Sequence, residues 1–377
     1  MTERSASGQP ASGRWAWADV DLAAVRHNIE VIRSVASPAV VWAVVKADGY
    51  GHGANEVALA ALDAGAAGLC VALVDEGVAL RRHGVGAPIL VLSEQPPGQL
   101  RSMIEHDLIS TVYSAAQIDA LCAAGARHHR VHLKVDTGMH RVGCDPADAL
   151  SLAARIESSA GVELAGLCTH LAVADEPGDP FTASQLDRFD TVLDGLVAAG
   201  IDPGMVHTAN SAGALAHPAA RRMMVRIGIA AYGVAPGPGL AGLAAALRPA
   251  MSLRARVSFV RRVVRGERVS YGLRHTFDRD STIATVPIGY ADGVPRRLFE
   301  TGGEVLIGGR RRPIAGVVTM DQTMIDMGDD QVDIGDDVVL IGRQGDAEIT
   351  ATDWAERLGT IGYEVVCGIG TRIERRY

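Results

Sequence analysis

The stretch VVWAVVKADGYGHG, residues 40–53, begins as an apolar run and ends in a loop that contains three glycines. Such a continuous apolar run predicts a strand that is covered on both faces, because a half-exposed strand would alternate apolar and polar residues. Lys46 stands where this strand ends, and the loop behind it carries Tyr50 and His52. The lysine is either a reactive amine or a solvated residue whose apolar stem lies along the surface.

Seven further apolar runs follow, and segments with helical spacing lie between them. The runs cover residues 68–73, 88–93, 109–113, 131–136, 164–171, 205–210 and 225–233. The helical segments cover residues 55–65, 75–84, 114–125, 145–159 and 183–200. Several of them open with Asp, Ser or Asn and close with Gly, which are helix start and stop signals. Alternating strands and helices predict a (β/α)₈ TIM barrel, and an open parallel sheet is the alternative that this pattern leaves open.

The character of the sequence changes after residue 249. Short strands separated by Gly, Asp and Arg turns follow, with one helical segment at residues 351–359, and together they predict a mostly antiparallel β domain. We therefore expect three parts. These are a disordered N-terminus over 1–13, a barrel over 14–249 and a C-terminal β domain over 250–377.

Composition narrows the classes of function. The 36 basic and 44 acidic residues give a formal charge of −8, which disfavours binding to nucleic acid or to anionic membranes. The five cysteines show neither a disulfide framework nor metal-ligand spacing, and no His, Asp and Glu set has ligand-like spacing either. No apolar run is long enough to span a membrane, so we expect a soluble, cytoplasmic protein without a metal.

Polar residues at the carboxyl ends of the predicted strands are the candidates for chemistry, because active sites of such barrels lie at that face. These residues are Lys46, Lys134, His170, Asn210, Ser211 and Arg226. A lysine among apolar neighbours is partly desolvated, which favours the neutral amine that can form an imine.

Two of these candidates suggest a bound anion or cofactor. Ser211 opens a short helical segment after the seventh strand, where barrels often bind phosphate, although an ordinary helix cap would look the same. Gly228 and Ile229 could add backbone N–H groups, since glycine lets the main chain come close to a ligand. Arg226 lies inside an apolar strand and therefore needs either a structural partner or a ligand.

Nine motifs, spread from about residue 14 to the C-terminus, closely resemble those of the pyridoxal-phosphate-dependent alanine racemases. They are VVKADGYGHGA, KVDTGMHRVG, THLAVADEP, ANSAGAL, VRIGIAAYG, VSYG, PIGYADG, TMDQ and TIGYEVV. The resemblance implies a barrel that binds pyridoxal 5'-phosphate and a homodimer whose sites are completed by the neighbour's β domain. It also implies interconversion of L- and D-alanine, which supplies D-alanine for peptidoglycan.

The same resemblance assigns two catalytic bases. Lys46 matches the lysine that binds the cofactor covalently and also acts as one base, and Tyr271 of the other subunit matches the second. A free phenol, with a pKa of about 10, is a poor base at neutral pH. His170 and Arg226 match a hydrogen-bonded chain to that tyrosine, whose positive potential would stabilise the phenolate.

The remaining site residues are implied by the resemblance alone. The cofactor-binding set comprises Tyr50, His170, Asn210, Ser211, Arg226, Gly228, Ile229 and Tyr363, with Arg226 facing the pyridine nitrogen. The substrate carboxylate is assigned to Arg141 and to the backbone N–H of Met320. Lys134 matches a lysine that is carbamylated in many members of the family and orients the arginine, and Asp321 is assigned a supporting role beside Met320.

Two positions depart from the family pattern. His140 stands where a small or amide residue is more usual, and Thr319 stands where cysteine is frequent. Both lie near the residues assigned to the substrate carboxylate, so we expect altered turnover or inhibitor affinity rather than lost activity. A related racemase of serine or another amino acid, or a non-catalytic cofactor carrier, remains an alternative, although a carrier would have no use for residues 250–377.

Overall fold

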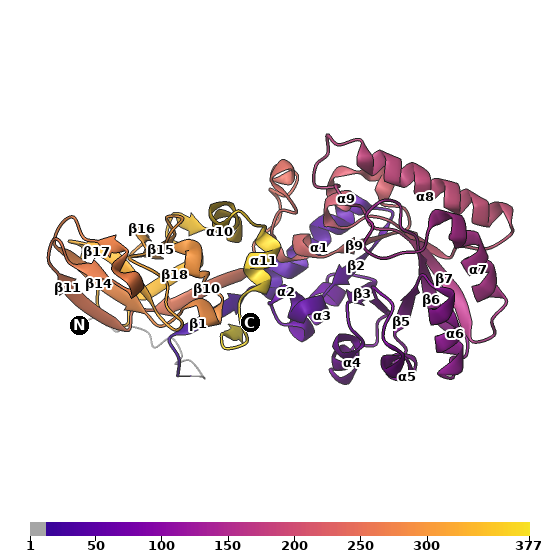
Figure 1. Cartoon of the computed structure of the whole chain (residues 1–377), viewed down its shortest axis with the longest axis horizontal. Helices are drawn as coiled ribbons and strands as arrows, with labels where there is room; N and C mark the ends of the chain where they lie inside the picture. Colours follow the sequence, from indigo (N-terminus) through magenta and orange to yellow (C-terminus); the bar gives the residue numbers. More distant parts are fainter. Residues whose placement is uncertain (1–12) are drawn as a thin grey trace. The chain divides into compact units, whose positions relative to one another are not determined.

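The computed structural model describes residues 13–377 and divides the chain into two compact units (Figure 1). One unit is Leu22–Arg248, and the other combines the N-terminal segment through Asp21 with Pro249–Tyr377. The expected disorder over 1–13 falls, apart from Gly13, outside the described residues.

The larger unit is a parallel barrel of eight strands. They are β2 (Val40–Val44), β3 (Gly68–Val71), β4 (Ile89–Val91), β5 (Ile109–Val112), β6 (His129–Lys134), β7 (Val162–Cys168), β8 (Met205–His207) and β9 (Met224–Ile227). Hydrogen-bonded pairing runs from β8 down to β2 and then to β9. Two backbone bonds, from Met223 to Val206 at 3.1 Å and from Arg226 to Ala209 at 3.0 Å, nearly close the ring. The predicted barrel is confirmed, and the open sheet is excluded.

Helices connect these strands. They are α1 (Leu22–Ala36), α2 (Lys46–Tyr50), α3 (Ala54–Asp63), α4 (Val74–Arg82), α5 (Pro97–Glu105), α6 (Ala115–Ala123), α7 (Ala149–Glu157), α8 (Phe181–Ala198) and α9 (Ser211–Ala216). Short 3₁₀ turns add η1 (Pro146–Asp148), η2 (Pro218–Ala220), η3 (Ile229–Tyr232) and η4 (Pro238–Leu240). The five predicted helical segments correspond to α3, α4, α6, α7 and α8, whereas α1 and α5 were not predicted.

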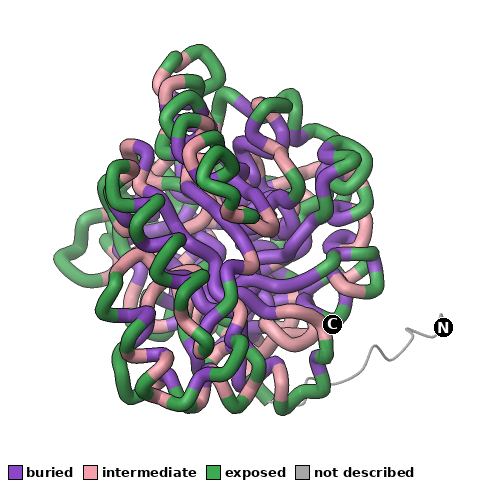
Figure 2. Tube along the Cα trace, turned by 90° about the vertical axis from the view of Figure 1, so that its right-hand side faces the viewer, coloured by how far each residue is buried: buried purple, intermediate pink, exposed green. Residues whose placement is uncertain are grey.

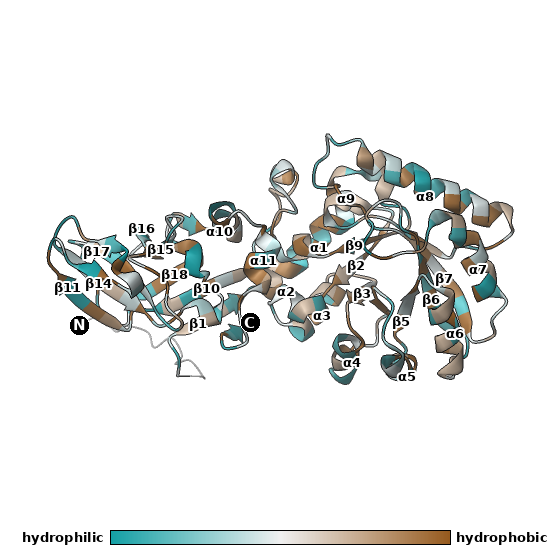
Figure 3. Cartoon of the chain, viewed as in Figure 1, coloured by the Kyte–Doolittle hydropathy of each residue, from teal (hydrophilic) through white to brown (hydrophobic). Residues whose placement is uncertain are grey.

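The barrel core forms because the strand residues are apolar on both faces. Every residue of β3, β4, β5 and β9 is buried. The helices are amphipathic: α8 buries Leu186, Phe189, Val192 and Leu196, which share one helical face. Figure 2 shows buried segments toward the middle and exposed segments around the outside, and Figure 3 shows hydrophobic and hydrophilic positions alternating along α8. Within residues 13–377 no helix combines the length and apolarity needed to cross a bilayer.

The second unit is built mainly from antiparallel strands, as predicted. Its main sheet has the order β16-β15-β18-β10-β1-β20 with β19 on β18, beside a three-stranded sheet β11-β14-β17 and the pair β12-β13. The strands are β1 (Ala16–Val20), β10 (Met251–Arg256), β11 (Phe259–Val263), β12 (Arg268–Val269), β13 (His275–Thr276), β14 (Ser281–Val286), β15 (Glu304–Ile307), β16 (Arg310–Pro313), β17 (Thr323–Gly328), β18 (Asp337–Gln344), β19 (Ala347–Ile349) and β20 (Glu374–Arg376). Helices α10 (Ala351–Leu358) and α11 (Gly362–Cys367) and turns η5 (Tyr271–Leu273), η6 (Tyr290–Asp292) and η7 (Arg296–Leu298) complete it.

The first strand of the chain, β1, lies in this second unit. It pairs antiparallel with β10, where Ala18 faces Leu253, and parallel with β20, where Ala18 faces Arg375. The expected barrel range of 14–249 therefore differs from the structure at its start. The physical reason is that β1, buried along most of its length, supplies the backbone partners that β10 and β20 need on their facing edges.

Candidate active site

Lys46 lies just beyond the carboxyl end of β2, where the chain enters a left-handed turn. The φ angles of Ala47, Asp48 and Tyr50 are 53°, 52° and 53°, and that of Gly49 is 61°. Residues other than glycine avoid this region at a cost of about 1–2 kcal/mol each. Backbone strain of this kind is kept where the surroundings enforce it, and it clusters at functional sites. The half-buried lysine is thus placed by a rigid, strained turn.

Specific contacts hold this turn. The backbone N–H of Ala47 donates to Oε1 of Glu76 at 2.6 Å, and that of Ala54 donates to Oδ1 of Asp48 at 2.9 Å. The ring of Tyr232 packs against the ring of Tyr50, with centroids 4.9 Å apart, and its hydroxyl donates to the carbonyl of Val44 at 2.9 Å. The turn is therefore tied both to α4 and to the strand that precedes it.

Two loops and Tyr50 meet at a cradle of donor groups. The hydroxyl of Ser211 accepts from the backbone N–H of Gly228 at 3.0 Å and from that of Ala230 at 3.4 Å. A Cβ added at Gly228 would lie 2.4 Å from the hydroxyl oxygen of Tyr50, so only glycine leaves room for the phenol there. Converging hydroxyl and amide donors of this kind are suited to a phosphate.

The neighbours of this cradle have structural roles of their own. Asn210 caps α9, since its Oδ1 accepts from the N–H of Gly213 at 2.9 Å, and its amide donates to the carbonyl of Leu171 at 3.4 Å. Ile229 begins η3 and is fully buried. Asn210 therefore orients the loop that presents Ser211.

Arg226 lies in β9 and is almost completely buried. Its guanidinium donates to the carbonyls of Thr169 at 2.8 Å and Thr208 at 3.0 Å, and to Nδ1 of His207. Nη2, the nitrogen that donates to both carbonyls, also lies 3.4 Å from Nδ1 of His170. All of these partners are neutral groups, and no carboxylate within residues 13–377 forms an ion pair with Arg226. The hydrogen bonds therefore orient the guanidinium without neutralising its charge.

The contact between Arg226 and His207 extends to a second buried histidine, since Nε2 of His207 lies 2.8 Å from Nδ1 of His132. Arginine only donates, so Nδ1 of His207 accepts and its Nε2–H donates to His132. Burial, and then the charge of Arg226, lower the pKa of His132 to about 3 and that of His207 well below 6.5. Both rings are neutral at pH 7, and Arg226 keeps its proton.

His132 and His207 were missed from the sequence, although a signal was present. His132 stands two residues before Lys134, and residues two apart on a strand point to the same side. If Lys134 points into the barrel, His132 must point into it as well.

Four cations surround His170. Burial first, and then the charges of Arg226, Lys134, Arg141 and Lys46, lower the pKa of His170 well below 6.5. Burial also lowers the pKa of Lys134 from 10.5 to about 8, and the charges of Arg226 and Arg141 add to that effect. This concentration of positive charge is suited to a ligand that carries several negative charges.

Arg141 is exposed on the loop after β6, and Asp136 shapes that loop. Oδ1 of Asp136 accepts from the N–H of Gly138 at 2.9 Å and of His140 at 3.0 Å, and its other oxygen lies 3.3 Å from the His140 ring. Although burial raises the pKa of Asp136, these hydrogen bonds outweigh it and lower the pKa. The unusual His140 thus helps to hold the loop that carries Arg141.

The other predicted site residues lie in the second unit. Tyr271 is 73% exposed, on a loop where Ser270 and Leu273 have positive φ angles of 65° and 48°. The Ser270 hydroxyl donates to the carbonyl of Val317 at 2.6 Å and anchors this loop. Tyr363 is half-buried in α11. A strained loop that displays a large aromatic side chain suggests a role beyond the packing of its own unit.

Met320 and Asp321 lie on a turn before β17. Met320 is 52% exposed, and within residues 13–377 its backbone N–H donates to no protein group. Asp321 accepts from Arg372 at 2.7 Å, and the Thr319 hydroxyl donates to the carbonyl of Gln322 at 2.8 Å. Thr319 thus supports the turn in the place of the more frequent cysteine. In the described part of the chain, no group of three or more His, Cys, Asp or Glu residues could hold a metal ion.

Comparisons with known proteins agree with this arrangement. The family described as "Alanine racemase, N-terminal domain" matches residues 20–236, and "Alanine racemase, C-terminal domain" matches residues 250–377. The chain is 50% identical over 365 residues to an alanine racemase of Symbiobacterium thermophilum, covering 96% of both. It is 43% identical to that of Frankia casuarinae, with full coverage of both.

Solved structures give the same result. Alanine racemase from Streptomyces lavendulae superposes with a TM-score of 0.91 at 40% identity, covering 98% of each chain. The Bacillus anthracis alanine racemase with bound L-Ala-P superposes with a TM-score of 0.90 at 40% identity, covering 96% of this chain and 94% of that one. The resemblance inferred from the nine sequence motifs is confirmed, and the chain belongs to the alanine racemase family.

Proposed function

We propose that this chain is a pyridoxal-phosphate-dependent alanine racemase that acts as a homodimer and interconverts L- and D-alanine. The proposal depends on one observation: three features lie at the same end of the barrel strands. They are Lys46, the donor groups around Ser211 and Gly228, and the buried Arg226, which pairs with no carboxylate in the described part of the chain. Family membership supports the same activity, and the Bacillus anthracis relative has been solved with L-Ala-P bound. All five cysteines are free, which agrees with a cytoplasmic enzyme that supplies D-alanine for peptidoglycan.

The barrel residues fit the proposed cofactor. Tyr50, Ser211 and the amides of Gly228 and Ile229 would bind the phosphate group. Lys46 would supply the amine for the aldehyde, and Arg226 would face the ring nitrogen. When bound, pyridoxal phosphate supplies an aldehyde that condenses with amines and a ring that withdraws electrons from the substrate Cα.

Arg226 has a defined consequence in this arrangement. An arginine stays protonated at any physiological pH, so it cannot give its proton to a ring nitrogen. Its neighbours His170 and His207 are neutral, because their pKa values are lowered well below 6.5 by burial and then by the charge of Arg226. By leaving the ring nitrogen of a bound cofactor unprotonated, Arg226 would favour rapid return of the Cα proton over side reactions such as transamination.

Racemisation requires one group to remove the Cα proton and another to return it from the opposite face. Lys46 is proposed for one face, and the partner subunit's Tyr271 is proposed for the other. The strained turn after Lys46 and the strained loop around Tyr271 would each hold their group at a fixed distance from Cα. The phenolate of Tyr271 would be stabilised by the positive charge of Arg226, with His170 as the hydrogen-bonded link between the two residues.

The substrate carboxylate is assigned to Arg141 and the partner subunit's Met320 N–H. Lys134 is proposed to carry a carbamate that orients Arg141. Carbon dioxide adds to a neutral amine, and the burial that lowers the pKa of Lys134 to about 8 makes that form accessible near neutral pH. The resulting anion would also balance part of the positive charge around His170.

An absorption spectrum before and after borohydride, followed by mapping of the labelled peptide, tests the proposal. The expected result is a coloured protein in which reduction fixes the cofactor on Lys46. Initial rates with alanine, serine, arginine and lysine then test the substrate, because one methyl or hydroxyl group provides only a few kcal/mol of discrimination at most. A colourless protein that does not react with added pyridoxal phosphate would refute the cofactor, and faster serine turnover would refute the substrate.

A further inference from the structure

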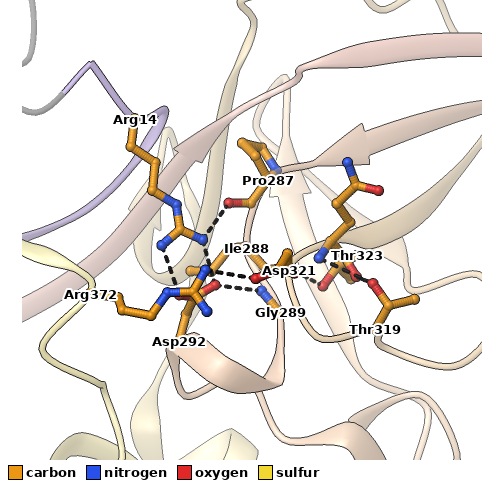
Figure 4. A network of polar contacts seen from close by, with 10 residues as sticks. Arg14, Pro287, Ile288, Gly289, Asp292, Thr319, Asp321, Thr323 and Arg372 are labelled. Atoms are coloured by element: carbon orange, nitrogen blue, oxygen red, sulfur yellow. Dashed lines mark hydrogen bonds and ion pairs between the residues drawn. The ribbon is translucent and has the colours of Figure 1, made fainter.

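A buried carboxylate, Asp292, joins the N-terminal segment to the turn that presents Met320 (Figure 4). Asp292 is fully buried, and Arg14 binds both of its oxygens, at 2.8 and 2.6 Å. Nε of Arg372 lies 3.3 Å from Oδ1 of the same carboxylate, and the N–H of Gly289 donates to Oδ2 at 3.0 Å. We call Arg14, Asp292 and Arg372 the Asp292 network.

The burial of Asp292 makes this network rigid. An ionised carboxylate removed from water loses several kcal/mol of solvation unless paired groups replace the water. Arg14 and Arg372 provide two positive charges, and Arg14 also donates to the carbonyl of Pro287 at 3.1 Å. The position of η6 is therefore coupled to the N-terminal segment, 278 residues away in the sequence.

The residues beside Asp292 in turn hold the main chain at Met320. The N–H of Tyr290 donates to the carbonyl of Thr319, and that of Ala291 donates to the carbonyl of Met320, both at 3.0 Å. A Cβ added at Gly289 would lie 2.3 Å from the carbonyl oxygen of Thr319 and 2.5 Å from that of Met320. The segment that begins with Gly289 and the turn at Thr319 and Met320 pack without space for a methyl group. A shift of η6 must therefore move the Met320 peptide.

Arg372 fixes the other side of Met320. Its Nη2 donates to Oδ1 of Asp321 at 2.7 Å, while its Nε faces Asp292. The carbonyl of Met320 is thus anchored by Ala291, and the following residue is anchored by Arg372. The N–H of Met320 belongs to the peptide whose carbonyl, that of Thr319, accepts from Tyr290. That bond therefore fixes the direction of the Met320 N–H, which donates to no protein group within residues 13–377.

We propose that Arg14, Asp292 and Arg372 are positioning residues that fix the direction of the Met320 N–H for the substrate carboxylate. The inference rests on the proposed function, in which that N–H binds the carboxylate across the dimer. It gives the N-terminal segment a part in substrate binding, because Arg14 supplies the bidentate contact to Asp292. Loosening the network weakens binding of the carboxylate and leaves Lys46 and Tyr271 unchanged.

The test compares Arg14→Gln and Arg372→Gln with Arg343→Gln in the full-length holoenzyme. Arg343 pairs with Glu348 at 2.9 Å in the same unit and serves as the matched control. Arg14→Gln disrupts the bidentate contact to Asp292, and Arg372→Gln disrupts contacts to both Asp292 and Asp321. Loss of at least one hydrogen bond to a charged group predicts that the KM for alanine rises roughly tenfold in each of these variants, while kcat changes less than about threefold. Amide hydrogen exchange of the peptide over 316–322 should become faster in both variants and stay unchanged in Arg343→Gln.

Each outcome decides the inference. Unchanged exchange in Arg14→Gln and Arg372→Gln would overturn the network, and faster exchange with an unchanged KM would overturn its role in carboxylate binding. An equal fall in kcat and kcat/KM would place the effect in proton transfer instead and would also overturn it. Arg14→Lys, which keeps the charge but not the bidentate geometry, should recover part of the KM.

The exchange measurement separates this inference from the proposed function. If the unsubstituted protein does not racemise alanine, the proposed function fails, yet faster exchange in the two variants would still support the coupling of Arg14 to the Met320 turn. Asp292→Asn is a stronger perturbation that risks misfolding, because it leaves Arg14 and Arg372 with a neutral partner. The two arginine variants avoid that risk, since each leaves one cation on the buried carboxylate.

Discussion

The hydroxyl of Ser211 lies 3.0 Å from the backbone nitrogen of Gly228, and this hydrogen bond joins the loop after β8 to the loop after β9. Tyr50, on the turn after β2, approaches the same glycine so closely that a Cβ would lie 2.4 Å from its hydroxyl oxygen. Three loops that are distant in sequence therefore meet around one residue without a side chain. That residue provides the simplest test of the proposed phosphate site.

Gly228→Ala should weaken binding of pyridoxal phosphate by at least about tenfold, because the methyl group displaces the Tyr50 hydroxyl and one charged hydrogen bond is lost. Absorbance titration of the cofactor-free protein measures the change. Gly195→Ala is the control, since a Cβ there meets no atom within 4 Å; equal affinities in the two variants would contradict the assignment.

Lys46→Ala and Tyr271→Phe should both abolish racemisation but should fail in different ways. Loss of Lys46 removes the amine that binds the cofactor covalently, so borohydride would no longer fix it to the protein. Loss of the Tyr271 hydroxyl leaves the cofactor bound and blocks proton exchange from one face only. Solvent-deuterium exchange started from each enantiomer distinguishes these failures, and undiminished exchange from both enantiomers in Tyr271→Phe would disprove the two-base mechanism.

Hybrid dimers of these two variants test the sharing of the site. If Tyr271 serves the partner's Lys46, a mixed dimer contains one site with both groups intact. Mixing the two inactive variants should then restore part of the activity, up to about half of that of an unsubstituted dimer per mixed pair. No recovery after verified subunit exchange would indicate that both bases come from one chain.

Much of this architecture could be predicted, because the barrel strands are buried on both faces and their apolar runs mark them directly. Helix α5 was missed, since it opens with Pro97 and buries only Leu100 and Met103. The left-handed turn at residues 47–50 was also hidden, because its non-glycine members adopt positive φ only under tertiary contacts such as that from Glu76 to the N–H of Ala47.

The candidate site was predictable where a polar residue interrupts an apolar strand, as Arg226 and Lys134 do. It was not predictable where function depends on a partner far along the chain. Nothing near Asp292 in the sequence indicates that Arg14 pairs with it, since the two are 278 residues apart. Long-range pairs of this kind follow from sheet register, and β1 was assigned to the wrong unit when only the sequence was considered.

Lys134 provides a prediction about pH. With a pKa lowered by burial to about 8, the neutral amine fraction rises from about 10% at pH 7 to about 75% at pH 8.5. Addition of isotopically labelled bicarbonate should therefore give a carbamate NMR signal that grows over this range. Lys134→Ala should lack the signal and should also lose any stimulation of activity by bicarbonate. A signal that persists in Lys134→Ala would assign the carbamate to another amine.

The burial of His129 should make the free energy of unfolding depend on pH. Burial lowers its pKa from 6.5 to about 4, so between these values the unfolded chain binds more protons than the folded chain does. Stability therefore falls as pH drops below 6.5, by about 1.4 kcal/mol per pH unit and about 3 kcal/mol in total from this residue. His129→Gln should flatten the curve of unfolding free energy against pH by that amount between pH 6.5 and 4, as measured by urea unfolding.

If the curve of unfolding free energy against pH were the same in His129→Gln as in the unsubstituted protein, other groups would be responsible for the loss of stability in acid. His83→Gln serves as a control, because that histidine is exposed on the surface of the barrel unit. This variant controls for a general effect of replacing a histidine on the unfolding measurement.

The place of β1 has a consequence for biosynthesis. The ribosome makes β1 first, yet its two neighbours, β10 and β20, are made only after the whole barrel has been synthesised. The barrel can therefore fold while the chain is still growing. One edge of β1 stays unpaired until β10 is made, and the other stays unpaired until β20 emerges at the end of synthesis. Unpaired apolar strands promote aggregation. We therefore expect chaperone binding and misassembly of the nascent chain to involve β1 more than the barrel strands.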